Sequence, residues 1–306
     1  MVEPAAPDAS SQAQTGQTTA GAALQGRPPE LEDWLNGQIY HPLSMRLARA
    51  LALTPITPNM VSIAGGLSIV LAALVYWFST SWTGVLLALI IHISWHVFDG
   101  ADGDLARLTK RTSSTGEVID GICDIVGHII LYVMLGVILA QDIGSFTAWI
   151  LAVGAGAGRI VQAAHYEVQR RQYQYWVYDK TWLRVAAKGE GKPPGIFGLG
   201  AVAYVTLGRL FAPGGQHVDE LVEAGSPAHK SALRDVIREE TVPVLRSTYL
   251  LSANYRTLVC GISMLAGSPL YFFMFEAVGL TLVLVISILT ASRATRRIQH
   301  QAKSLR

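Results

Sequence analysis

Charged residues are scarce in this sequence. Asp, Glu, Lys and Arg supply 15% of its 306 residues, whereas about 25% is usual for soluble domains. This shortage argues against a soluble globular protein. The formal net charge of +2 says little by itself, and we expect no nucleic-acid partner.

Cysteine is also scarce, because the chain has only Cys123 and Cys260. Both lie inside apolar segments, where a small buried thiol is more common than a disulfide. The sequence shows neither the ligand spacing of a zinc site nor an internal repeat. We therefore expect two buried thiols without a structural role for sulfur.

Hydrophobic residues make up 51% of the chain, and the mean hydropathy is +0.34. Six apolar stretches approach the roughly 20 residues that a helix needs to span hydrocarbon. These stretches are 61–78, 84–98, 117–140, 144–165, 256–275 and 277–292. We therefore predict an all-α integral membrane protein with six transmembrane helices.

The segments before the first span have a different character. Residues 1–30 are rich in Ala, Gln, Pro, Gly, Ser and Thr, which predicts a disordered cytosolic tail and not a signal peptide. Residues 31–54 carry apolar residues at helical spacing, with Arg46 and Arg49 between them. This pattern predicts an amphipathic helix in the membrane interface. A soluble helix packed on the core is the alternative.

A long insertion, residues 171–250, separates the first four spans (55–170) from the last two and a basic tail (251–306). We expect it to be cytosolic or interfacial. Residues 196–211 predict an interfacial or re-entrant helix, and the polar residues 217–247 predict helix. Aromatic residues at its start resemble a membrane-interface belt: Tyr173, Tyr175, Trp176, Tyr178 and Trp182.

Loop charges orient the predicted spans. The connections 79–83, 141–145 and 267–276 contain no Lys or Arg, whereas the opposite loops and the C-terminal tail are basic. By the positive-inside rule, both termini face the cytoplasm. The expected location is the bacterial inner membrane, with the acidic cluster described next on the cytoplasmic side.

Four carboxylates mark the ends of the second and third spans. Asp99 and Asp102 are spaced i, i+3, and Asp120 and Asp124 are spaced i, i+4, so each pair lies on one helix face. Acids beside hydrocarbon are costly and usually functional. Two divalent cations, Mg²⁺ or Mn²⁺, would balance the charge, as in phosphoryl-transfer sites. Solvated acids at two helix ends are the alternative.

The spacing of this region is also a family signature. The pattern D-x-x-D-G-x-x-A-R-x8-G-x3-D-x3-D runs without a gap from Asp99 to Asp124, through Gly103, Ala106, Arg107, Gly116 and Asp120. It resembles the signature of the CDP-alcohol phosphotransferases, integral membrane enzymes that make phospholipids and related phosphodiesters. The resemblance implies that an acceptor alcohol attacks the β-phosphate of a CDP-alcohol, such as CDP-diacylglycerol, and that CMP leaves.

The resemblance also implies residue roles. Asp99, Asp102 and Asp120 would hold the two metals, and Asp124 would accept the proton and contact the second metal. Arginine-phosphate pairing also suits Arg107. The CDP part would be bound by Gly103, Arg107, Ser113, and by Asn59 and Ser62 of the P-N-x-x-[ST] element. For Asn59 a helix cap is an equal alternative, a role also open to Thr57. By the same resemblance we expect a homodimer.

The acceptor is less defined. Arg159 and Arg256 lie near the ends of the fourth and fifth spans, where they could hold an acceptor's phosphate. Snorkelling of these charges to the interface is the alternative. Asp104 resembles the branch of the family that transfers to inositol phosphate, although a solvated acid explains it equally. His165 is interpreted as a satisfied interfacial histidine.

Two other functions use similar residues. Membrane prenyltransferases bind diphosphates through Asp and Mg²⁺, but they use two separate Asp-rich motifs, and this chain has one continuous motif. A cation transporter could use the four acids, but transport sites lie near the bilayer midplane of repeated halves. Release of CMP separates the transferase from the transporter.

Overall fold

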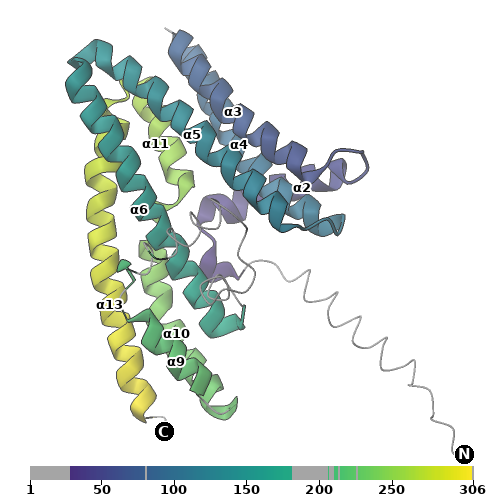
Figure 1. Cartoon of the computed structure of the whole chain (residues 1–306), viewed down its shortest axis with the longest axis vertical. Helices are drawn as coiled ribbons and strands as arrows, with labels where there is room; N and C mark the ends of the chain where they lie inside the picture. The colour runs from purple at the N-terminus through teal and green to yellow at the C-terminus, as the bar shows by residue number, and fades with distance from the viewer. Residues whose placement is uncertain are drawn as a thin grey trace, which may run out of the picture.

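The computed structural model describes residues 28–79, 81–180, 206, 210–212, 214–224 and 227–304, and within these the regular structure is entirely helical. Five helical runs are long and apolar enough to cross a membrane. They are α3 (Pro58–Phe78), α4 (Trp82–Leu108), α5 (Ser114–Ile143), α6 (Ser145–Tyr178) and the continuous run of α12 (Leu270–Met274), η4 (Phe275–Gly279) and α13 (Leu280–Ser304). Figure 1 shows α6 and α13 as two long neighbouring helices.

The prediction of an all-α membrane protein is confirmed, but the structure differs at the last two predicted spans. The helix α11 (Ala253–Leu265) has 13 residues, about 20 Å at 1.5 Å per residue, and is short for a hydrocarbon core of about 30 Å. The chain turns at Gly267, which has φ +89°. The next helix begins at Leu270, seven residues before the predicted start, because Gly267 and Pro269 place the break earlier.

Side-chain caps set the starts of the helices around the acidic motif. The Thr57 hydroxyl accepts from the Met60 N–H at 3.4 Å and starts α3, so Thr57 rather than Asn59 is the cap. Ser81 caps α4, and Ser113 caps α5 through the Gly116 N–H at 3.0 Å. The two central helices of the site therefore begin at residues that the local sequence specifies.

Close helix packing holds α3 against α5. A Cβ added to Gly66 would lie 2.9 Å from Cys123 Cβ, a distance that real Cβ atoms avoid. Glycine therefore lets the two helices approach directly beside the acidic motif. Cys123 and Cys260 are free thiols, but only Cys260 is buried as predicted, in the core that α3, α4, α5, α6, α11 and α12 share, whereas Cys123 is half-buried.

The segment before α3 is helical within the predicted range 31–54. A short 3-10 turn (Pro29–Leu31) is followed by η2 (Asn36–Tyr40) and α2 (His41–Leu51). This segment packs on α4, where Ser44 Oγ donates to the Val97 carbonyl at 3.0 Å. A Cβ at Gly100 would lie 2.5 Å from Ser44 Oγ, so glycine is required for this contact. Residues 1–27 of the predicted tail lie outside the described residues.

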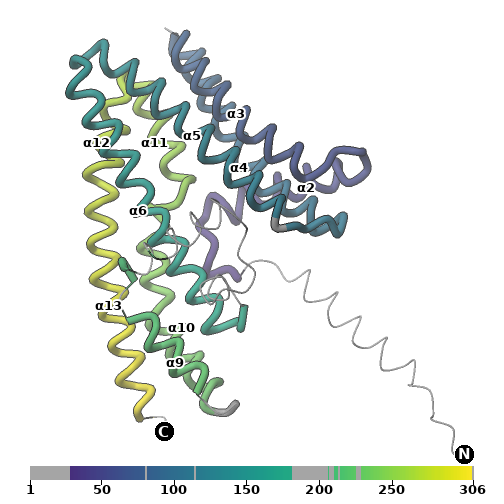
Figure 2. The backbone as a smooth tube through the Cα atoms, viewed as in Figure 1, coloured from purple at the N-terminus to yellow at the C-terminus, as the bar shows by residue number. Residues whose placement is uncertain are grey.

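The helices α9 (Gly215–Ala224) and α10 (Pro227–Ser247) pack on the ends of α6 and α13. Figure 2 shows this second bundle at the end of the molecule near the C-terminus. The predicted helix over 217–247 is therefore observed as two helices. Trp182 and residues 196–205 lie outside the described part of the chain.

The interpretation of the aromatic residues after 171 as an interface belt is wrong for Tyr173 and Trp176. Both side chains are buried in the second bundle. Trp176 Nε1 donates to Asp219 Oδ1 at 2.7 Å, and the Tyr173 hydroxyl donates to Glu30 at 2.9 Å. Their polar tips find partners on protein elements far away in sequence, so these rings hold the bundle together.

Candidate active site

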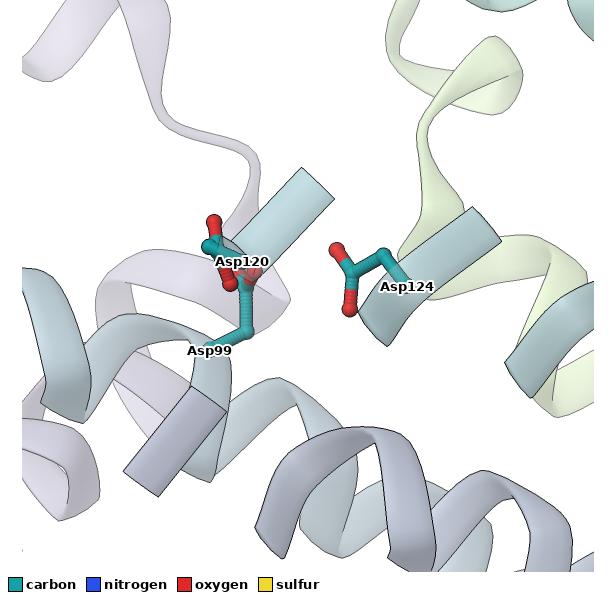
Figure 3. A group of neighbouring side chains, drawn as sticks. All are labelled: Asp99, Asp120 and Asp124. Carbon is teal, nitrogen blue, oxygen red and sulfur yellow. The ribbon is translucent and has the colours of Figure 1, made fainter. Parts of the chain in front are cut away.

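Three of the four predicted acids meet between α4 and α5. Asp99, Asp120 and Asp124 each offer one carboxylate oxygen, and these oxygens all lie within 4.8 Å of one another. Figure 3 shows Asp99 and Asp120 side by side, with the Asp124 carboxylate facing them across a gap. Carboxylate oxygens at this spacing are the ligand set that Mg²⁺ and Mn²⁺ prefer.

Asp102 lies next to this group but is held differently. Its side chain is buried, and its Oδ2 accepts from Ser62 Oγ at 2.5 Å. It also interacts electrostatically with Asp120. Neighbouring carboxylates repel one another when both are ionised, so a proton or a cation that neutralises part of their charge stabilises this arrangement. A divalent cation fits this donor set.

The Asp124 carboxylate has a partner that sequence reasoning missed. Trp95 Nε1 donates to Asp124 Oδ1 at 2.6 Å, and the indole ring is buried. Trp95 precedes Asp99 by one helical turn on α4, so it faces α5 from the same side. The spacing of Trp95 and Asp99 was the only sequence signal for this contact. A tryptophan within an apolar helix is expected to pack against other apolar side chains, so the hydrogen bond was not predicted.

The residues expected to bind the CDP part fall into two groups. Asn59 and Ser113 converge on Gly116, where an added Cβ would lie 3.2 Å from Ser113 Oγ and 3.3 Å from Asn59 Oδ1. Gly116 therefore leaves the room in which these two polar side chains meet.

The second group lies one turn along α4. The Arg107 guanidinium covers Gly103, with Nη1 3.4 Å from the position of an added Cβ. It also pairs with Asp104 Oδ1 at 2.5 Å, while about half of the Arg107 side chain remains exposed. Ser62, the last predicted residue of this set, contacts Asp102 instead of open solvent.

The structure gives Arg256 other partners than an acceptor. Its side chain is buried and forms an ion pair with Glu276, and it also donates to Gln162 Oε1 at 2.9 Å. These contacts favour a structural role for Arg256 over acceptor binding or snorkelling. Arg159 lies over the Tyr132 ring, 5.7 Å from its centroid, and donates to the Tyr132 hydroxyl at 3.4 Å.

The Arg256–Glu276 pair carries a stability prediction. Arg256→Ala leaves the Glu276 carboxylate buried without its counter-charge, which typically costs about 3–5 kcal/mol. We expect a clear fall in the unfolding temperature of the detergent-solubilised protein, and recovery in the double variant Arg256→Met, Glu276→Leu. An Arg256→Ala protein as stable as the wild type would show that the pair is not needed.

His165 is a satisfied histidine, as predicted. Its Nδ1 contacts the Phe211 carbonyl at 2.8 Å and its Nε2 contacts Ser287 Oγ at 2.8 Å. With both ring nitrogens occupied, His165 fixes α6 to α13 and to the segment before α9. Its position supports the geometry of the bundle and not the chemistry at the acids.

Comparison with known proteins places these residues in a family context. The family model described as CDP-alcohol phosphatidyltransferase matches residues 55–215, a range that contains α3 to α6 and all four acids. A search of curated proteins finds no match to the chain.

Proposed function

Because the chain belongs to the CDP-alcohol phosphatidyltransferase family, we propose that it moves a phospho-alcohol group, phosphatidyl or similar, from a CDP-alcohol to an acceptor alcohol. CMP is the second product. The observation that carries the proposal is the convergence of Asp99, Asp120 and Asp124 within 4.8 Å, inside the matched range. The reaction belongs to phospholipid or related phosphodiester synthesis.

Asp99, Asp102, Asp120 and Asp124 are the residues that would hold two divalent ions, Mg²⁺ or Mn²⁺. When bound, the ions neutralise the diphosphate and stabilise the charge that develops on it. Ser62 holds the Asp102 carboxylate in place. This contact with Asp102 gives Ser62 a role other than the CDP binding that the family resemblance implies.

The nucleotide part is proposed to bind where Asn59, Ser113 and Gly116 meet, with Gly103 and Arg107 on its diphosphate side. Arg107 carries the exposed cation of this group, and its fork of N–H donors suits phosphate oxygens. Asp104 holds the guanidinium at 2.5 Å and so orients it. This arrangement leaves Asp124 on the far side of the acidic group for the acceptor.

Asp124 is proposed to take the proton of the acceptor hydroxyl. The hydrogen bond from Trp95 fixes Oδ1 of the carboxylate, and the carboxylate as a whole faces Asp99 and Asp120. Trp95 is thus a positioning residue for the base. It keeps the carboxylate in one orientation within an otherwise apolar helix pair.

Trp95→Phe tests this positioning. The variant keeps most of the ring volume and removes the N–H, and a hydrogen bond to a charged group is worth about 1.5–3 kcal/mol. We expect turnover to fall by roughly tenfold to a hundredfold, while the KM for the CDP-alcohol is unchanged. Trp82→Phe, at the exposed start of α4, is the matched control. Normal turnover of Trp95→Phe would remove Trp95 from the mechanism.

The proposed topology has six spans with both termini and the acids on the cytoplasmic side, α11 being the short fifth span. A cysteine replacing Ser81 should react with an impermeant thiol reagent added outside intact cells, and one replacing Thr112 should not. Both positions are exposed, and Cys123→Ala with Cys260→Ala removes the background. Equal labelling of the two positions would contradict this orientation.

The segment before α3 is proposed to lie in the membrane interface. Trp34, Ile39 and Leu43 are exposed, whereas Ser44 and Ala48 are buried against α4, so the apolar side chains are free to enter lipid. A homodimer is the expectation from the family. Cross-linking in native membranes measures it directly.

Lipid mass spectrometry of cells with and without the protein tests the proposed reaction and names both substrates. One phosphodiester should disappear with the protein and return with the wild-type chain. An unchanged phosphodiester profile would contradict a role in lipid synthesis. Altered ion content with an unchanged profile would favour the transporter alternative.

A further inference from the structure

A polar cavity of about 180 Å³ adjoins the acidic group at Asp99. Four parts of the chain form its wall: the segment 36–44, α4, α6 and the start of α11. Asp99 and Trp95 are part of this wall. The cavity therefore connects to the first metal-binding acid and to the residue that positions Asp124.

Several polar atoms at this wall are unsatisfied. His41 Nε2, Arg170 Nε and Ser252 Oγ are buried without a hydrogen-bond partner among the described residues. Buried polar groups in folded proteins are normally paired. Three unpaired ones around one cavity indicate a site for a ligand that offers several hydrogen-bonding groups.

The cationic groups at the wall lie beside carboxylates. Arg170 lies 3.5 Å from the Glu167 carboxylate, which Arg171 also contacts at 2.5 Å. His41 Nε2 lies 3.8 Å from the Glu32 carboxylate. Asn254 donates to Asp33 at 2.8 Å. A phosphate would have to compete with Glu167 for Arg170 and would lie near the Asp99 carboxylate of the same wall, whereas an uncharged ligand does neither.

Aromatic side chains complete the wall. The Tyr40 ring stacks on His96 with centroids 4.7 Å apart, and Trp95 lies 4.4 Å from the same imidazole. Burial, together with the nearby Asp33 carboxylate, raises the pKa of Tyr40 to about 12, so its hydroxyl remains a donor. Flat apolar faces with a few placed polar groups are typical of small-molecule pockets.

We infer that this cavity binds the acceptor of the proposed reaction, and that the acceptor is a small uncharged polyol. The inference rests on the function proposed above. The volume exceeds the about 30 Å³ of one water molecule several times but leaves no room for acyl chains. Any lipid part of the product is therefore carried by the CDP-alcohol.

Part of the cavity wall comes from segments that the family model does not match, so the choice of acceptor alcohol can differ between family members. Residues 36–44 and 252–254 of the wall lie outside the range 55–215 that the family model matches. The matched residues provide the shared chemistry. The unmatched segments close the cavity and select the alcohol.

The reaction geometry follows from the shared wall. A polyol hydroxyl beside Asp99 and Trp95 is within reach of Asp124, which takes its proton. The hydroxyl oxygen forms the new bond to the β-phosphorus, and the bond from that phosphorus to the oxygen of CMP breaks. Atoms and charge balance without a further reactant.

The test measures CMP release by the full-length protein in lipid nanodiscs with CDP-diacylglycerol and Mg²⁺ or Mn²⁺. Glycerol, myo-inositol and glucitol are compared with glycerol 3-phosphate and inositol 1-phosphate. We expect at least one neutral polyol to be used at least tenfold more efficiently than the phosphorylated alcohols. Preference for a phosphorylated alcohol would overturn the inference and leave the transferase function standing.

Wall variants give the second readout. Tyr40→Phe and Ser252→Ala each remove one hydroxyl, and a lost hydrogen bond of about 1 kcal/mol corresponds to roughly a fivefold to tenfold weaker interaction. We expect the KM for the polyol to rise by that factor with the KM for CDP-diacylglycerol unchanged. Ser68→Ala, a buried serine of α3 outside the cavity, is the matched control. A rise in the donor KM alone would contradict an acceptor site.

A binding measurement separates this inference from the proposed function. If none of these alcohols yields CMP with CDP-diacylglycerol, equilibrium dialysis with radiolabelled myo-inositol and glycerol still tests the cavity. Binding to the wild type that is weakened in Ser252→Ala supports a polyol site, and no binding of either overturns it. CMP release from a CDP-linked polyol with diacylglycerol as acceptor would also overturn the assignment to the acceptor.

Discussion

Replacing Asp99 or Asp120 by Asn is expected to abolish CMP release. Each change keeps the side-chain volume and removes one anionic ligand from a group of oxygens held within 4.8 Å. Hard divalent cations depend on that negative charge. Activity should return in part at high Mn²⁺ in at most one of the two variants.

The control for these variants is Asp142→Asn, at the opposite end of α5, where Asp142 contacts Ser268 at 3.2 Å. It should retain normal activity. Titration of Mn²⁺ followed by electron paramagnetic resonance should show two sites in the wild type and fewer in the two ligand variants. Near-normal turnover of both ligand variants in Mg²⁺ would rule out the two-metal arrangement.

Asp124→Asn is expected to lower turnover by roughly 10²–10⁴-fold, the usual contribution of a general base. The amide keeps the shape and can still accept from Trp95, but it cannot take the acceptor proton. Binding of the CDP-alcohol, which we propose depends mainly on Asp99, Asp102 and Arg107, should change far less. Asp124 lies one turn beyond Asp120, within the apolar part of α5, which separates it from the nucleotide residues.

Both constants must be measured on the same preparation. A loss of nucleotide affinity with turnover otherwise intact would make Asp124 chiefly a metal ligand. The comparison with Trp95→Phe is informative, because that variant disturbs the same carboxylate without removing it. We expect turnover to fall less in Trp95→Phe than in Asp124→Asn, with CDP-alcohol binding unchanged in Trp95→Phe.

The acidic site could be predicted because its information is local. Asp99, Asp102, Asp120 and Asp124 lie on two consecutive helices, and helix periodicity alone places each pair on one face. Ser113 and Thr57 are capping residues that mark the helix starts in the sequence. A hairpin of such helices brings the acids together without any contact from distant segments.

The contacts that the sequence did not predict join residues far apart in the chain. Arg256 pairs with Glu276 in the interior of the bundle, and Trp176 reaches Asp219 on α9. Periodicity within one helix carries no information on such partners. The cavity beside Asp99 could not be predicted for the same reason, because four segments far apart in the chain form its wall.

The span count shows a different limit. Hydropathy placed a boundary near residue 276, where Glu276 interrupts the apolar run, but that carboxylate is neutralised inside the protein by Arg256. The helix therefore continues through residues 275–279 as a π-helical turn. Turn chemistry at Gly267 and Pro269 was the better indicator of the break.

One measurement tests the central claim most directly. The purified chain, in detergent or nanodiscs, is incubated with a CDP-alcohol such as CDP-diacylglycerol and an alcohol extract of the native cells, and CMP is quantified. We predict CMP release that requires Mg²⁺ or Mn²⁺, stops with EDTA and is absent in Asp120→Asn. CMP release that is the same with EDTA, or no release by a folded protein across the CDP-alcohols tested, would contradict the proposed function.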